Sequence, residues 1–115
     1  MCGVKTRYGA IGVDGRAVNC KTTHDSALDS ILKWAHKAGK ATGIVTTTRI
    51  THATPAAAYA NIYYRDLEAF DDVNFNLQMH NEGCKDIAAQ LVEDNYFINV
   101  RERENKKRIQ IHLNV

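Results

Sequence analysis

Apolar residues recur at helical spacing in the first third of the chain. The stripe consists of Leu28, Ile31, Leu32 and Ala35, which stand at i, i+3, i+4 and i+7. Ser26 followed three residues later by Asp29 is typical of a capping box at a helix start. Gly39 suits the left-handed position just after a helix end. The pattern predicts a helix over residues 26–38.

A short β-branched run follows this helix. Residues 42–48 read TGIVTTT and are bounded by Gly39 and Arg49, which predicts a buried strand. A helix that leads into a short continuous strand favours a parallel α/β arrangement. Residues 10–13 are predicted to form the preceding strand, which would complete a right-handed β-α-β unit. The predicted fold class is therefore α/β.

The remaining pattern predicts shorter elements. Thr54 and Pro55 are expected to be the N-cap and first residue of a short helix that runs to Ala60. Residues 61–82 show no steady period and predict a long surface connection. A helix is expected at residues 84–92 and a strand at residues 96–100. The mixed charges of residues 101–108 are typical of a solvated face, and apolar residues alternate at strand spacing after them.

Composition narrows the class of protein. The chain has 115 residues, of which 44% are apolar and 24% charged, as expected for one globular domain. A net charge of +2 gives no reason to expect nucleic acid as a partner. No apolar run has the length of a membrane span, and the N-terminus lacks the apolar stretch of a secretory signal. The three cysteines contain no CxxC pair and leave the pairing of thiols open.

The polar groups that could carry chemistry gather in residues 46–55, TTTRITHATP. If residues 52–54 are extended, His52 and Thr54 point to the same side. A hydroxyl is an acceptable Mg²⁺ ligand beside carboxylates and waters, but it cannot hold the ion alone. Arg65 has a planar guanidinium that could grip a phosphate at two oxygens. The structural alternatives are a cap for Thr54, a loop histidine for His52 and a solvated arginine for Arg65.

Residues 30–60, SILKWAHKAGKATGIVTTTRITHATPAAAYA, closely resemble the animal-type alkaline phosphatases. Further segments match in the same order, and together with this run they extend the resemblance over about residues 2–100. They are Cys2 to Lys5, Gly9 to Val13, Arg65 to Asp66 and Gly83 to Leu91. The segment TTTRITHATP is long and unusual, so a chance match is implausible.

The resemblance implies a fold and an activity. The fold would be part of a three-layer α/β sandwich around a mostly parallel central sheet. The activity would be hydrolysis of phosphate monoesters through a phosphoserine, with two Zn²⁺ ions and one Mg²⁺ ion as cofactors. The family protein would be a homodimer at the cell surface, GPI-anchored or extracellular. The phosphate monoester substrate is then the expected ligand.

The same resemblance implies roles for individual residues. Thr54 would contribute its hydroxyl to Mg²⁺, and His52 would lie beside that ion, through water. Arg65 would hold two oxygens of the substrate phosphoryl group. Cys20 and Cys84 would form the family's disulfide, which leaves Cys2 as a free thiol.

The departures from the family pattern predict a fragment. The family nucleophile is expected upstream of Cys2, and the Asp-Ser-Ala at residues 25–27 is expected to be unrelated to it. The zinc ligands and the magnesium carboxylates are not matched, and Leu67 stands where a tryptophan is expected. We interpret residues 1–100 as a partial catalytic domain and residues 101–115 as a tail outside the family pattern. The alternative function is a non-catalytic truncated product that binds at most phosphate or a partner.

Overall fold

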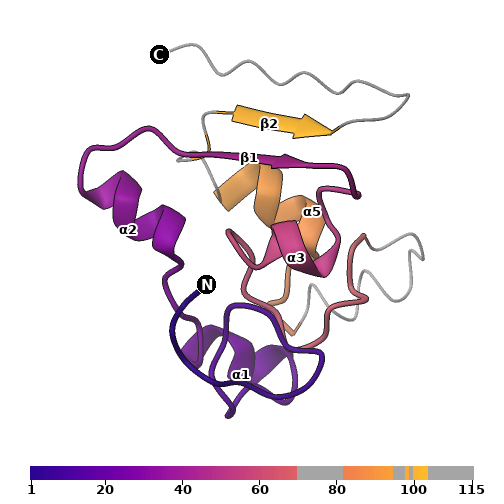
Figure 1. Ribbon diagram of the computed structural model, residues 1–115. Helices are drawn as coiled ribbons and strands as arrows, with labels where there is room; N and C mark the ends of the chain where they lie inside the picture. Colours follow the sequence, from indigo (N-terminus) through magenta and orange to yellow (C-terminus); the bar gives the residue numbers. More distant parts are fainter. Residues whose placement is uncertain (70–81, 95–97, 99, 104–115) are drawn as a thin grey trace.

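A computed structural model describes residues 1–69, 82–94, 98 and 100–103 of the chain. The elements in chain order are helices α1 (Cys20–Asp25) and α2 (Ile31–Lys37), strand β1 (Gly43–Thr46), helices α3 (Ala53–Ala56) and α5 (Ile87–Ala89), the π-helix η1 (Gln90–Asp94) and strand β2 (Val100–Arg103). Figure 1 shows β1 and β2 side by side at one end of the molecule and α1 at the opposite end, with α3 and α5 between them.

The two strands run parallel. Gly43 lies opposite Val100, and Thr46 lies opposite Arg103. The strand predicted at residues 42–48 is therefore confirmed over β1, but its predicted burial is wrong, since only Ile44 of the strand is buried. Parallel neighbours require a long connection between them, and here the connection contains α3, α5 and η1. The pairing agrees with the α/β class.

One apolar core joins β1 to the helices below it. Its buried members are Ile11, Ile44, Ala56, Ala58, Tyr59, Ala60, Ile62, Ile87, Leu91 and Ile98. These residues come from the N-terminal segment, from β1, from α3 and the residues after it, from α5 and η1, and from the segment just before β2. Burial of their apolar surface is the main favourable contribution that holds these distant segments together.

The helix predicted over residues 26–38 is wrong at its N-terminal end. The helix α2 begins at Ile31, and its N-cap is Ser30, whose Oγ accepts a hydrogen bond of 3.3 Å from the Lys33 N–H. The Ser30 hydroxyl also donates to a buried backbone carbonyl in the α3 region. The predicted C-terminal end is confirmed, because Gly39 follows α2 with φ of +76°.

Backbone pairing explains the late start. The Leu28 N–H donates to the Gly12 carbonyl over 2.8 Å, and the Asp14 N–H donates to the Ser26 carbonyl over 2.9 Å. These bonds hold the segment extended beside residues 12–14. A helix from Ser26 would require the same backbone groups for its first turn, so tertiary pairing overrides the capping signal.

The strand predicted at residues 10–13 does not pair with β1 in the described part of the chain. Ile11 forms an isolated antiparallel bridge with Ile62, and Val13 forms another with Ala27. The predicted β-α-β unit through residues 10–13 is therefore wrong. The physical reason is that this segment meets two returning segments of the chain rather than a sheet edge.

The short helix after β1 begins earlier than predicted. His52, with φ of −61° and ψ of 151°, is the N-cap of α3. The Ala56 N–H donates to the His52 carbonyl over 2.9 Å and closes the first turn. Thr54 is therefore the second residue of the helix rather than its cap, and Pro55 is the third. A proline is tolerated there because first-turn N–H groups lack helical partners.

The helix predicted at residues 84–92 is shifted toward the C-terminus. The Asp86 Oδ1 accepts a hydrogen bond of 2.6 Å from the Ala89 N–H and caps α5. The helix continues directly into η1. Ile87 and Leu91 are buried, as the apolar pattern predicts.

Several predictions lie wholly or partly outside the described residues. The connection predicted over residues 61–82 includes residues 70–81, which lie outside the described residues. In its described part the surface prediction is wrong at Ile62, which is buried in the core. The strand predicted at residues 96–100 overlaps the described chain only in part, and β2 begins at its last residue. The alternating residues of the C-terminal stretch also fall outside.

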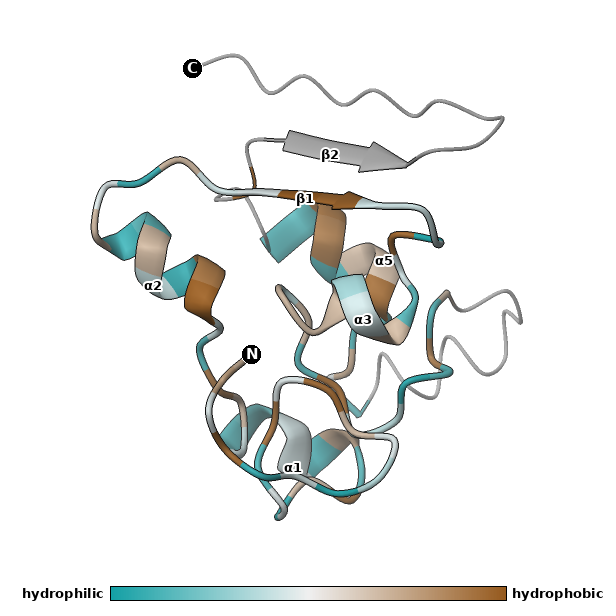
Figure 2. Ribbon diagram, in the orientation of Figure 1, coloured by the Kyte–Doolittle hydropathy of each residue, from teal (hydrophilic) through white to brown (hydrophobic). Residues whose placement is uncertain are grey.

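Some large apolar side chains are exposed, in the N-terminal segment as well as on β1 and α2. Val45 of β1 is 71% exposed, and Ile31 and Trp34 of α2 are exposed as well. Figure 2 shows hydrophobic residues along β1 and at the start of α2. Parallel strands are normally covered on both faces.

No helix in the described part of the chain has the length and apolar character needed to span a bilayer.

Candidate functional site

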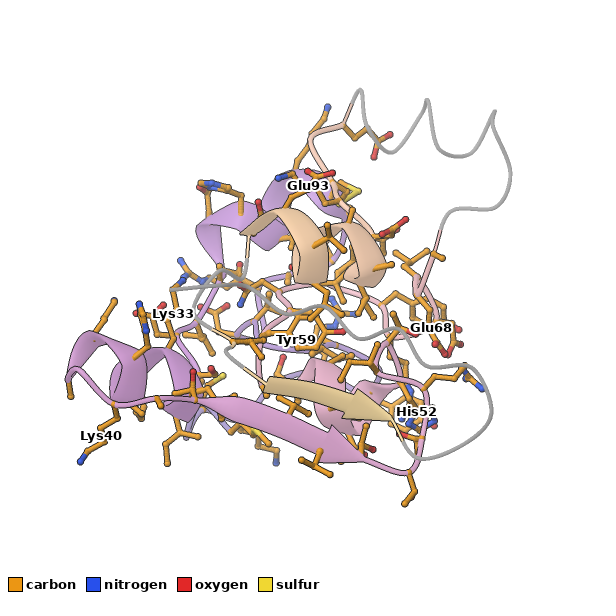
Figure 3. All side chains as sticks on the ribbon, turned by 90° about the horizontal axis from the view of Figure 1, so that it is seen from above. Lys33, Lys40, His52, Tyr59, Glu68 and Glu93 are labelled. Carbon is orange, nitrogen blue, oxygen red and sulfur yellow. A yellow bond between two sulfur atoms is a disulfide. The ribbon has the colours of Figure 1, made fainter. Side chains whose placement is uncertain are left out.

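The polar segment predicted to carry chemistry follows the carboxyl end of β1. The strand ends at Thr46, the chain turns, and His52 leads into α3. Figure 3 shows His52 at the end of the molecule toward which both strands point. In open parallel sheets this is the edge where ligands bind. The location therefore agrees with a functional site.

Thr54 and Arg65 line the same pocket, which has a volume of about 270 Å³. Thr54 reaches it from α3 and is exposed, whereas the half-buried Arg65 reaches it from the segment after the core residue Ile62. The backbone N–H of Arg65 donates to the Gly9 carbonyl over 2.7 Å. This bond fixes the segment against the N-terminal part of the chain. A hydroxyl and a guanidinium thus share one concave surface.

Much of the pocket lining comes from the N-terminal segment. It includes Cys2, Thr6 and the glycine-containing residues 9–13. The Thr6 Oγ1 is buried and has no hydrogen-bond partner among the described residues. The N-terminal segment therefore contributes Cys2, Thr6 and glycine-containing backbone to the pocket that Arg65 also lines.

His52 contacts Arg65 at the margin of this pocket. The His52 Nε2 lies 3.5 Å from the Arg65 Nη2, at the outer limit of a hydrogen bond. Arginine can only donate, so the contact is favourable when this ring nitrogen carries no proton. The His52 Nδ1 is buried without a partner among the described residues. One polar atom of the imidazole is therefore buried and unpaired in the described part of the chain.

The expectation that His52 and Thr54 share one side of an extended segment is wrong. His52 is extended, but Ala53 is already helical, so the period of two does not apply. Thr54 lines the pocket directly, and His52 is related to it through Arg65. The three predicted residues are still close, for a reason different from the one the pattern suggested.

A fourth group, Glu68, binds the turn before His52 and was missed by the sequence reasoning. Its carboxylate accepts hydrogen bonds from Arg49 Nε at 3.0 Å and from Arg49 Nη2 at 2.7 Å. Thr51 Oγ1 adds a third bond of 2.6 Å. The sequence offers no periodic signal for this set, because Glu68 lies in the stretch without a regular pattern.

These hydrogen bonds shift the ionisation of Glu68. Those from Arg49 lower the pKa of Glu68 to about 2. The Thr51 hydrogen bond and the positive charge of Arg49 act in the same direction, against partial burial. The same ion pair raises the pKa of Arg49. Glu68 is therefore ionised throughout the physiological range.

The described residues do not form a metal site by themselves. They contain no group of three or more histidine, cysteine or acidic side chains that could hold a metal ion. The Thr54 hydroxyl is a suitable oxygen donor for Mg²⁺, but that ion takes an octahedral set of oxygens, several of them usually water. The nearby carboxylate of Glu68 is already occupied by Arg49 and Thr51. A complete site would need further donors.

The disulfide implied by the resemblance is present in the structure. Cys20 and Cys84 are joined, with their Cα atoms 5.3 Å apart, and Cys2 is a free cysteine. The bond ties α1 to the segment just before α5. Neither cysteine lines the pocket that contains Thr54 and Arg65, and both pack against Tyr63 and Leu67.

The Asp-Ser-Ala at residues 25–27 lies outside the pocket. Ser26 is buried where α1 ends, and Asp25 is exposed. Neither residue lines the pocket that contains Arg65. The location agrees with the interpretation of this tripeptide as unrelated to a nucleophile.

Comparison with known proteins identifies the class. The model of the alkaline phosphatase family, described as "Alkaline phosphatase", matches residues 1–101. The chain therefore belongs to the alkaline phosphatase family. It is 49% identical over 96 residues to the tissue-nonspecific isozyme of alkaline phosphatase from Gallus gallus. That match covers 82% of this chain and 18% of the relative, so the chain spans about a fifth of its length.

Two solved structures are also similar. The alkaline phosphatase from the Antarctic bacterium TAB5 is 42% identical, with a TM-score of 0.49, and the match covers 58% of this chain and 17% of that one. A mutant of the TAB5 enzyme with Mg bound in its M3 site is 40% identical, with the same TM-score and coverage. The membership in the family rests on the sequence matches.

Proposed function

We propose that this chain is part of the catalytic domain of an alkaline phosphatase, a hydrolase of phosphate monoesters that works through a phosphoserine intermediate. In this proposal Arg65 holds two oxygens of the substrate phosphoryl group. The observation that carries the proposal is that Arg65 and Thr54 line one pocket, formed by α3, the N-terminal segment and the segment of Arg65. A planar guanidinium in a concave site matches the geometry of a phosphate.

Thr54 and His52 are assigned to the magnesium side of the same site. Thr54 would supply a hydroxyl ligand to Mg²⁺, and His52 would lie beside the ion, through water. When bound, the ion would supply positive charge close to the reacting phosphate. Because the described residues lack the carboxylates for a complete site, these must come from other parts of the enzyme. The Zn²⁺ ions are proposed from the family alone.

The finer architecture is also proposed from the family. Residues 1–100 would belong to a three-layer sandwich with a mostly parallel central sheet, and residues 101–115 would form a tail outside it. The exposure of Val45 on β1 supports a larger sheet, since further elements would cover that face. The parent enzyme would be a homodimer at the cell surface, GPI-anchored or extracellular.

The alternative is a truncated product without catalytic activity that binds at most phosphate or a partner. It and the first proposal agree on phosphate binding and differ on turnover. We expect the 115-residue chain to show no turnover of p-nitrophenyl phosphate, because these residues supply neither the nucleophile nor the zinc ligands of the family. Steady hydrolysis that disappears in Arg65→Ala would contradict this expectation.

Binding of inorganic phosphate tests the role of Arg65. Calorimetric titration of the full chain should detect binding, and Arg65→Gln should weaken it by about tenfold or more, since a charge-assisted bidentate contact is lost. Arg16→Gln is a matched control, because Arg16 pairs with Asp14 and does not line the pocket. Equal losses in both variants, or no binding by the parent chain, would reject the assignment.

A further inference from the structure

Glu68 connects the two segments that carry the candidate site. Its carboxylate binds Arg49 and Thr51, both in the turn between β1 and α3 that ends at His52. Glu68 itself lies three residues beyond Arg65. The Glu68 side chain therefore connects the segment that contains Arg65 to the turn that ends at His52.

The backbone of Glu68 is held independently of its side chain. The Ile87 N–H donates to the Leu67 carbonyl over 3.1 Å, and the Ala88 N–H donates to the Glu68 carbonyl over 3.0 Å. Both donors belong to the first turn of α5, which contributes Ile87 to the buried core. The carboxylate thus projects from a fixed support. The turn that contains Arg49 is also held by the Tyr59 hydroxyl, which donates to the Ile50 carbonyl over 2.8 Å.

A backbone hydrogen bond closes the turn between Arg49 and His52. The His52 N–H donates to the Arg49 carbonyl over 2.9 Å, so the residue that binds Glu68 also defines the turn before α3. Movement of Arg49 would therefore move the His52 backbone. It would also change the 3.5 Å contact between His52 and Arg65. Figure 3 shows His52 and Glu68 on the same side of the molecule.

We propose that Glu68 is a positioning residue for the phosphate site: by holding Arg49 and Thr51 it fixes His52 beside Arg65. The inference rests on the proposed function, since it assigns a support to the same pocket. Glu68 acts through other residues and is not expected to touch phosphate. Its negative charge would by itself disfavour a nearby anion.

The competing explanation is an ordinary surface ion pair, which contributes little to structure. Two observations favour positioning. The Glu68 side chain is 23% exposed against 59% for Arg49, and the carboxylate receives two bonds from one guanidinium and a third from Thr51. Bidentate pairs with an additional donor are more directional than single contacts.

The two explanations predict opposite signs in one experiment. The affinity of the full chain for inorganic phosphate is measured for the parent, Glu68→Gln and Arg49→Gln. If the pair acted only through charge, loss of Glu68 would tighten anion binding and loss of Arg49 would weaken it. Positioning predicts that both variants weaken binding, each by about five- to tenfold. Tighter binding by Glu68→Gln would overturn the proposal.

Two further variants serve as controls. Arg49→Lys keeps the charge but cannot form the bidentate contact, so positioning predicts weaker binding and a pure charge effect predicts no change. Glu93→Gln removes a carboxylate from another surface pair, with Lys85 at 3.1 Å, and Figure 3 shows Glu93 well away from Glu68. This variant should bind phosphate as the parent does.

Hydrogen exchange of the His52 amide separates failure of this inference from failure of the proposed function. Glu68→Gln and Arg49→Lys should each speed its exchange by about tenfold, while the Ile62 amide, bonded to Ile11 over 2.8 Å in the core, reports whether the fold is intact. If the parent chain binds no phosphate, the proposed function fails and the exchange data still test the turn. Unchanged exchange at His52 in both variants would reject the positioning role.

Discussion

The Arg65 Nη2 lies 3.5 Å from the His52 Nε2, and this contact joins the segment after β1 to the segment after the core residue Ile62. A guanidinium can form a hydrogen bond with an imidazole only if the ring nitrogen accepts rather than donates. His52 therefore helps to decide the direction in which Arg65 presents its remaining donors. The pocket is the place where those donors are available to an anion.

This contact predicts a graded response at His52. His52→Leu removes the acceptor and should weaken binding of inorganic phosphate by about three- to fivefold, because Arg65 loses a partner that orients it. His52→Gln retains an acceptor and should lose less. Calorimetric titration of both variants measures the difference. Equal affinities for the Leu and Gln variants would show that the ring nitrogen does not orient the arginine.

Glu68 predicts a loss of stability in acid. Its pKa is about 2 in the folded chain, below the ordinary value of 4.5. The unfolded state therefore binds the proton first as the pH falls, and stability is lost progressively between about pH 5 and pH 2. We expect a contribution of about 1–2 kcal/mol after allowing for solvent screening at the exposed Arg49. Urea unfolding across this range should show a flatter pH dependence in Glu68→Gln, whereas an identical dependence would contradict the assignment.

The disulfide between Cys20 and Cys84 should make a large contribution to stability. The two residues are 64 positions apart, and closing a loop of that length corresponds to about 4 kcal/mol in the chain-entropy model. The double variant Cys20→Ala with Cys84→Ala should therefore unfold at a much lower urea concentration. Cys2→Ala is the control, because Cys2 is a free cysteine. A reducing agent should reproduce the effect in the parent chain and leave the double variant unchanged.

Two glycines with positive φ should respond differently to alanine. At Gly12, φ is +63° and an added Cβ would overlap the Ala60 carbonyl oxygen. At Gly39, φ is +76° and the space is open. Gly39→Ala should cost about 1 kcal/mol of stability from backbone strain alone. Gly12→Ala should cost about 3 kcal/mol or more, because backbone must also move. Similar urea midpoints for the two variants would contradict this difference.

Local patterns in the sequence were sufficient where a signal and its consequence lay within a few residues. The β-branched run before Arg49 predicted β1, Gly39 marked the end of α2, and Ile87 and Leu91 were placed on a buried face. Local signals failed where distant backbone competed for the same groups. Ser26 carried a capping pattern, but its carbonyl accepts from Asp14, and the helix begins only after Ser30.

The sequence by itself determined the family, through the long segment around His52 and Thr54, and with it the candidate residues. Only the tertiary structure decided that Thr54 and Arg65 line one pocket, that His52 reaches it through Arg65, and that Glu68 binds the turn before α3. The physical reason is the distance along the chain over which each kind of signal acts. Helical and strand periods act over a few residues, whereas these contacts join segments through a shared core, and no periodic pattern records which distant side chains will meet.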